Sequence, residues 1–91
     1  MARVITVGAA QLGPIQRADS RPKVVERLCA MMRDAHDKGC DLVVFPELAL
    51  TTFFPRWYIE DQAEIDGWFE SAMPGAETQK LFDLAAELKI A

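Results

Sequence analysis

The sequence contains few of the side chains from which metal sites and disulfide frameworks are built. Its 91 residues include one histidine, His36, and two cysteines, Cys29 and Cys40. A zinc site needs about four ligands drawn from His, Cys and carboxylate side chains, and these three residues are too few and too far apart in sequence. Two cysteines do not form a disulfide framework either. We therefore expect no metal, and reduced thiols in a cytoplasmic protein.

Long apolar runs and clusters of basic residues are also missing. No stretch approaches the roughly 20 apolar residues of a membrane span. Ten basic against 14 acidic residues give a net charge of −4, with no run of Lys or Arg to neutralise phosphates. These features argue against nucleic acid and membranes as partners. Because 51% of the residues are apolar and no segment is low-complexity, we expect one globular domain or part of one.

What is present in the first half predicts a strand, a helix and a second strand. Residues 4–12 are apolar on both alternating faces, which favours a strand covered on both sides. Thr6 and Gly8 interrupt this short run and argue against an export signal. Residues 42–45 form a continuous apolar run that is β-branched at its centre, typical of a buried strand. With a helix between them, the two strands should be parallel neighbours in one sheet.

The intervening helix, residues 21–38, has clear start and stop signals. Asp19 or Ser20 can cap its first amides, and Pro22 is tolerated in a first turn. Gly39 supplies the left-handed residue that commonly ends a helix.

The second half predicts a long loop followed by two helices. Residues 46–60 are rich in aromatics and lack periodicity, which indicates an ordered loop of the kind that is usually functional. Asp61 and Glu64 resemble a capping box before a short helix, and residues 76–88 form an amphipathic helix. The sequence stops at Ala91, where a third strand is expected to begin. We therefore expect residues 1–91 to be the N-terminal part of a single domain, truncated after Ala91.

Glu47 is the candidate catalytic residue. Pro46 has no amide hydrogen and ends the pairing of the strand before it, so Glu47 should stand just beyond the carboxyl edge of the sheet, where α/β proteins bind ligands. Nearby aromatic side chains could partly desolvate this carboxylate and make it a general base. These side chains are Phe45, Phe53, Phe54 and Trp57. The alternative is a solvated glutamate at the start of a loop.

The residues around Glu47 resemble a known signature. FPEL (45–48) after an apolar strand is similar to the first signature of the nitrilase superfamily of carbon–nitrogen hydrolases. The longer run FPELALTTFFPRW (45–57) resembles the N-carbamoyl-D-amino acid amidohydrolases in particular. The similarity extends to AAQLGPIQRA (9–18), to the MPG turn (73–75) and to the helix LFDLAAEL (81–88).

This resemblance implies a fold, a reaction and a set of catalytic groups. It implies that residues 1–91 are the N-terminal part of an α/β protein with a four-layer α-β-β-α sandwich. The family hydrolyses carbon–nitrogen bonds with a Glu-Lys-Cys triad and no cofactor, and its general base matches Glu47. The family's lysine and cysteine motifs lie downstream of Ala91, so the chain alone should be inactive. The parent is expected to act on an N-carbamoyl-D-amino acid and to be a homo-oligomer.

Other readings remain open at this point. The substrate of the parent could be another amide, carbamoyl compound or nitrile, and a small non-catalytic α/β binding module belongs to a different class. Cys29 and Cys40 are expected to be structural, because one lies beside the apolar stripe of a helix and the other at the opposite sheet edge from Glu47. His36, in the last turn of its helix, and Arg56, between a proline and a tryptophan, are expected to be structural too.

Overall fold

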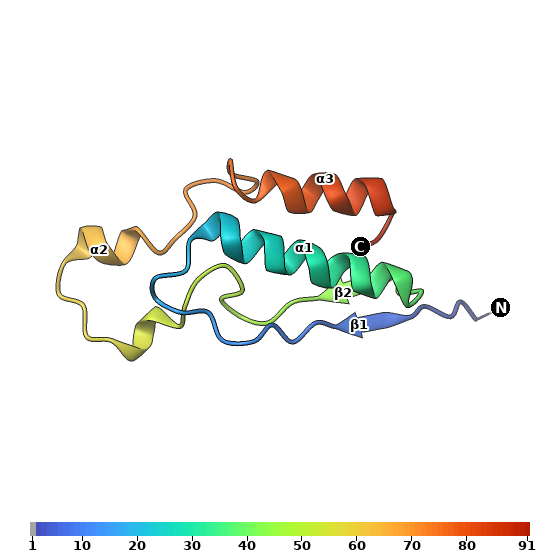
Figure 1. Ribbon diagram of the computed structural model, residues 1–91, viewed down its shortest axis with the longest axis horizontal. Coiled ribbons are helices and arrows are strands. Elements are labelled where there is room, and N and C mark those ends of the chain that lie inside the picture. Colours follow the sequence, from blue (N-terminus) through green and yellow to red (C-terminus); the bar gives the residue numbers. More distant parts are fainter. Residues whose placement is uncertain (1) are drawn as a thin grey trace.

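Two short parallel strands and two longer helices form one half of the structure, a computed structural model that describes residues 2–91 (Figure 1). The other half consists of loops with a short helix and a 3-10 turn. The elements in chain order are β1 (Val7–Ala9), α1 (Arg21–Asp37), β2 (Leu42–Val44), η1 (Phe54–Arg56), α2 (Gln62–Asp66) and α3 (Gln79–Leu88). The molecule is elongated, with extents of 54 × 24 × 23 Å.

The two strands pair in parallel, as the sequence predicts. Val7 lies opposite Leu42 and Ala9 opposite Val44. Both strands are shorter than predicted. At the carboxyl end the last bond runs from the amide of Ala10 to the carbonyl of Val44, at 2.8 Å, and Pro46 has no amide hydrogen with which to extend the ladder.

Helix α1 begins and ends where its capping residues predict. The Ser20 hydroxyl accepts the amide hydrogen of Lys23 at 3.3 Å, and Pro22 lies in the first turn. At the other end Gly39 has a φ of +82°, the left-handed conformation that glycine adopts at little cost. No described helix, from residue 2 to residue 91, is both long and apolar enough to cross a membrane.

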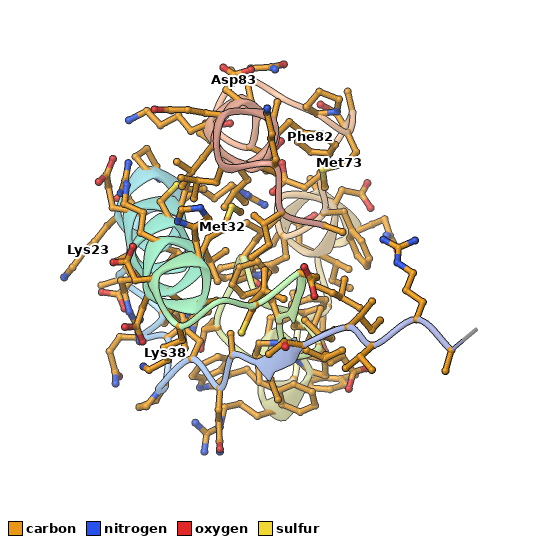
Figure 2. All side chains as sticks on the ribbon, turned by 90° about the vertical axis from the view of Figure 1, so that its right-hand side faces the viewer. Lys23, Met32, Lys38, Met73, Phe82 and Asp83 are labelled. Atoms are coloured by element: carbon orange, nitrogen blue, oxygen red, sulfur yellow. The ribbon has the colours of Figure 1, made fainter. Side chains whose placement is uncertain are left out.

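The core lies between α1, α3 and one face of the sheet. In Figure 2, Met32 lies in the space between the two helices, whereas Lys23, Lys38 and Asp83 point away from it. The core cluster joins residues of α1, β2, α3 and the segment after it. Its buried members are Val25, Cys29, Met32, Ala35, Val43, Leu84 and Ile90. The predicted packing of both helices on the sheet is therefore confirmed.

Helix α3 begins three residues later than predicted, at Gln79. The Thr78 hydroxyl accepts the amide hydrogen of Gly75 at 2.6 Å, and the carbonyl of Gly75 accepts that of Gln79. Residues 76–78 therefore form a turn before the helix. Beyond α3, the amide of Ala91 donates to the carbonyl of Asp41 at 2.9 Å, and the carbonyl of Ala91 accepts the amide hydrogen of Val43 at 2.8 Å. Ala91 is thus bonded to β2 in the manner of a parallel neighbour.

One face of the two-stranded sheet is open. The helices cover the face that carries Gly8 and Val43, whereas the side chains of Val7 and Val44 are each 52% exposed. The expectation that residues 4–12 are covered on both sides is therefore wrong for this chain. Their apolar alternation specifies two buried faces, but residues 2–91 supply a covering layer for only one of them.

The loops that follow both strands extend from the same end of the molecule, towards η1 and α2 (Figure 1). Two ion pairs connect the end of the loop after β1 and the start of α1 to α2 and the residues that follow it. Arg17 donates to Glu64 at 2.9 Å, and Arg21 pairs with Glu70 while donating to the carbonyl of Gly67. Asp61 caps α2 as predicted, by accepting the amide hydrogen of Ala63. Glu64 does not complete the capping box, because its carboxylate faces Arg17 instead.

Candidate functional site

Glu47 follows β2 by three residues, at the carboxyl edge of the sheet. It opens a turn of residues 47–50, and its side chain is exposed. The predicted position is therefore confirmed, because the strand ends at Val44 and Pro46 separates it from the turn. Only two residues separate Glu47 from the end of β2, which is paired with β1. The strand therefore restrains the backbone on the N-terminal side of Glu47.

A cavity of about 190 Å³ lies beside Glu47. Its walls come from the loops that follow the two strands, which the parallel arrangement brings to the same edge. The loop after β1 contributes Leu12, Gly13 and Ile15, and the loop after β2 contributes Pro46, Glu47, Leu48, Ala49, Thr51 and Phe53. Most of these side chains are apolar. An apolar wall with few polar groups is typical of small-molecule sites.

Leu48, directly after Glu47, adopts a left-handed backbone conformation with a φ of 50°. This conformation costs a residue with a Cβ atom about 1–2 kcal/mol. Lys89 is the other non-glycine residue with positive φ in the described part of the chain, and it lies at the end of α3, where such a residue is common. Leu48 ends no helix, so its conformation has a different cause.

The aromatic residues of the loop do not gather around Glu47 as expected. Of the four, only Phe53 lines the cavity. Phe54 instead stacks on Trp68, with ring centroids 6.0 Å apart, and meets Phe69 edge to face. The ring of Trp57 lies under the guanidinium groups of Arg17 and Arg56. The expected aromatic surroundings of Glu47 are therefore not seen within residues 2–91, because Phe45 packs against the core, Phe54 against residues that follow α2, and Trp57 against two arginines.

Thr51 and Trp68 are polar side chains that the sequence did not single out. The Thr51 hydroxyl and the Trp68 indole nitrogen are buried, and neither has a hydrogen-bonding partner within residues 2–91. Both residues line a second cavity of about 190 Å³, and Thr51 also lines the Glu47 cavity. A buried polar group without a hydrogen-bonding partner lowers the free energy of unfolding by about 1–3 kcal/mol. Thr51 and Trp68 are therefore two destabilising positions in this part of the chain.

None of the remaining candidates, Cys29, Cys40, His36 and Arg56, lines the Glu47 cavity. Cys29 is buried in the core, and this burial raises the pKa of its thiol. Cys40 packs beside Gly8, and the Arg56 guanidinium lies 5.5 Å from the ring centroid of Trp57. His36 is half-exposed, with its Nδ1 3.7 Å from a carboxylate oxygen of Asp37. Between residues 2 and 91, no three side chains of the His, Cys, Asp and Glu types are grouped to hold a metal ion.

The arrangement offers a carboxylate beside an apolar cavity. Such a group can accept and return a proton. The cavity wall, as far as residues 2–91 form it, includes no cysteine, lysine or histidine. As far as residues 2–91 form it, the cavity therefore offers a carboxylate, but no nucleophile and no positive group of the kind that covalent acyl transfer requires.

A comparison with known protein families identifies the family of the chain. The model of the carbon–nitrogen hydrolase family matches residues 6–91, which include both strands, all the helices and the Glu47 loop. The chain belongs to the carbon–nitrogen hydrolase family, within the nitrilase superfamily.

Proposed function

We propose that residues 1–91 are the N-terminal part of an enzyme that hydrolyses N-carbamoyl-D-amino acids to the D-amino acid, ammonia and carbon dioxide, with Glu47 as its general base. The observation that carries this proposal is the position of Glu47, at the carboxyl end of β2 and beside a cavity, in a chain of the carbon–nitrogen hydrolase family. The choice of substrate rests on the similarity of residues 45–57 to the N-carbamoyl-D-amino acid amidohydrolases.

In the proposed reaction, a cysteine and a lysine from the rest of the parent join Glu47 at the cavity. The thiol gives its proton to the Glu47 carboxylate, and its sulfur adds to the carbamoyl carbon. The lysine stabilises the negative oxygen that forms. Glu47 then returns the proton to the leaving nitrogen as the carbon–nitrogen bond breaks. Glu47 then takes a proton from water, whose oxygen adds to the carbonyl carbon of the acylated cysteine. The carbon–sulfur bond breaks, Glu47 returns this proton to the sulfur, and the carbamic acid that is released loses carbon dioxide to give the second nitrogen product.

The open sheet face supports a four-layer α-β-β-α sandwich as the fold of the complete domain. A four-layer α-β-β-α sandwich needs a second sheet against the first. Val7 and Val44 present apolar, half-exposed side chains on the face that α1 and α3 leave open. We assign this face to the second sheet of the complete domain. A cytoplasmic homo-oligomer is part of the same proposal.

The test is turnover by the complete enzyme with Glu47→Gln. Glutamine keeps the size of the side chain but cannot accept the proton, and general acid–base catalysis commonly contributes about 10²–10⁴ in rate. We expect kcat for an N-carbamoyl-D-amino acid to fall by that factor while the melting temperature stays unchanged.

Glu60→Gln is the matched control, because Glu60 is an exposed glutamate in the loop before α2. Near-wild-type turnover with Glu47→Gln would remove Glu47 from the mechanism. Turnover of another amide or a nitrile, but of no carbamoyl compound, would keep the base and change the substrate.

A further inference from the structure

Leu48 has a strained backbone next to the proposed general base, with no helix end to account for it. We propose that Leu48 is a positioning residue for Glu47: its left-handed conformation turns the chain directly after the glutamate and keeps the carboxylate at the cavity. This inference rests on the proposed function, because it concerns the base of that reaction.

The conformation is imposed by residues on either side of Leu48. Phe45, before the turn, and Leu50, at the end of the turn, both pack against the hydrophobic core. Between these two anchors the φ of Pro46 is fixed by its ring. The bond across the turn, from the amide of Thr51 to the carbonyl of Leu48, is long at 3.4 Å. A weak bond of this kind cannot hold the strain, so the anchors must do so.

The side chain of Leu48 adds a third point of attachment. It is half-buried, and Leu48 lines both the Glu47 cavity and the second cavity, which Thr51 and Trp68 also line. The side chain therefore belongs to the partition between two hollow spaces. Because the Leu48 side chain is held between the two cavities, the left-handed backbone of Leu48 fixes the direction of the backbone that connects it to Glu47.

A shift in this turn should affect turnover more than substrate binding. Displacement of a catalytic group by about 1 Å can cost on the order of 10² in rate. Glu47 lies one residue from Leu48, so relaxation of the strained backbone would move the carboxylate while leaving most of the cavity wall in place. The expected signature is a lower kcat at a nearly constant KM.

Leu48→Ile and Leu48→Asn, in the complete enzyme, separate positioning from simple packing. Isoleucine keeps the size and apolar character but is β-branched, and it resists the left-handed region. Asparagine loses the apolar contact but tolerates that region. We expect Leu48→Asn to keep kcat within about tenfold of wild type, and Leu48→Ile to lower it on the order of 10²-fold at similar KM. A packing role predicts the opposite order.

A second comparison applies even if one variant folds poorly. At a position with negative φ, a protein with alanine is more stable than the same protein with glycine. At a position with a left-handed backbone, the glycine variant is the more stable one. We expect the chain with Leu48→Gly to melt about 4–8 °C above the chain with Leu48→Ala. A higher melting temperature for Leu48→Ala, or turnover by Leu48→Ile that equals or exceeds that of Leu48→Asn, would overturn the inference. If Leu48→Ile is as active as wild type while Glu47→Gln is inactive, the positioning role fails and the proposed function stands. An active Glu47→Gln enzyme overturns both.

Discussion

Gly8 lies directly against Cys40: a Cβ atom on Gly8 would come within 3.1 Å of the Cys40 sulfur and 3.6 Å of the Ala35 Cβ. The first strand can approach α1 and the loop before β2 this closely only because Gly8 has no side chain.

The first prediction is that Gly8→Val destabilises the chain by about 1–3 kcal/mol, the usual cost of overpacking a closely packed site. Urea unfolding of the purified chain measures it. Gly13→Val is the control, because a Cβ at Gly13 would meet only Arg27, at 3.5 Å. Cys40→Ala should recover part of the loss in the Gly8→Val background. Equal losses for the two glycine variants would contradict the contact as described.

The second prediction compares the two ion pairs that join α1 and the preceding loop to α2 and the residues after it. The side chains of Arg21 and Glu70 are 26% and 18% exposed, against 50% and 46% for Arg17 and Glu64. Arg21→Ala also leaves the carbonyl of Gly67 without its donor. We expect Arg21→Ala to cost about 1–3 kcal/mol and Arg17→Ala at most about 1 kcal/mol. Thermal unfolding of both variants tests the order, and a larger loss for Arg17→Ala would show that exposure does not govern these pairs.

The third prediction concerns the two thiols. Burial raises the pKa of Cys29 and shields its sulfur, whereas Cys40 is only half-buried. Because the thiolate is the reactive form, a thiol-specific reagent at pH 8 should modify Cys40 first and Cys29 only when the chain unfolds. Mass spectrometry of peptides, with and without urea, assigns the sites. Simultaneous modification in the folded chain would mean that α1 is not packed as described.

The fourth prediction is a pH effect at the start of α1. The amide hydrogen of Gln16, bonded to the Asp19 carboxylate at 2.8 Å, lowers the pKa of Asp19 below its ordinary value of 3.8, and Lys23 and Arg27 contribute. A lowered pKa means that the stabilisation is fully present above pH 3.8 and is lost as the pH falls through the folded-state pKa. Asp19→Asn should therefore be less stable than wild type at pH 6, and the difference should shrink below pH 3.8. A difference independent of pH would exclude the charge as its origin.

The fifth prediction is that the 91-residue chain alone releases no ammonia from N-carbamoyl-D-phenylalanine. The Glu47 cavity, as far as residues 2–91 form it, includes neither a cysteine nor a lysine. The Glu47 carboxylate alone cannot form the proposed covalent intermediate. A colorimetric ammonia assay on the purified chain provides the measurement. Ammonia release that disappears on alkylation of Cys29 or Cys40 would contradict the assignment of these cysteines to the core.

The helices were predictable from sequence because their signals are local. Ser20 and Gly39 mark the two ends of α1 within a residue, since capping depends on side chains next to the helix. The start of α3 was missed because the Gly75–Thr78 turn uses the Thr78 hydroxyl, which competes with helical bonding. The strand lengths were overestimated because pairing also requires a partner backbone, and Pro46 interrupts it.

The site was predictable only in part. The position of Glu47 was predictable, because the apolar strand and the proline that ends it both lie directly before Glu47 in the sequence. The contribution of Leu12 and Ile15 to the cavity could have been inferred, because parallel strands deliver their following loops to one edge. The left-handed conformation of Leu48 could not, because it depends on how Phe45 and Leu50 are anchored to the core. The same applies to Phe54, whose stacking partner Trp68 is distant in sequence.

The open sheet face also bears on how the chain behaves in solution. Val4, Ile5, Val7 and Val44 expose between 49% and 88% of their surface, and they are carried by the two strands or by the residues leading into them. Neighbouring uncovered apolar side chains of this kind favour self-association and aggregation. The isolated chain should therefore require low concentration or a solubilising fusion to stay dispersed, and it should bind a dye such as ANS more strongly than a protein whose sheet is covered on both faces.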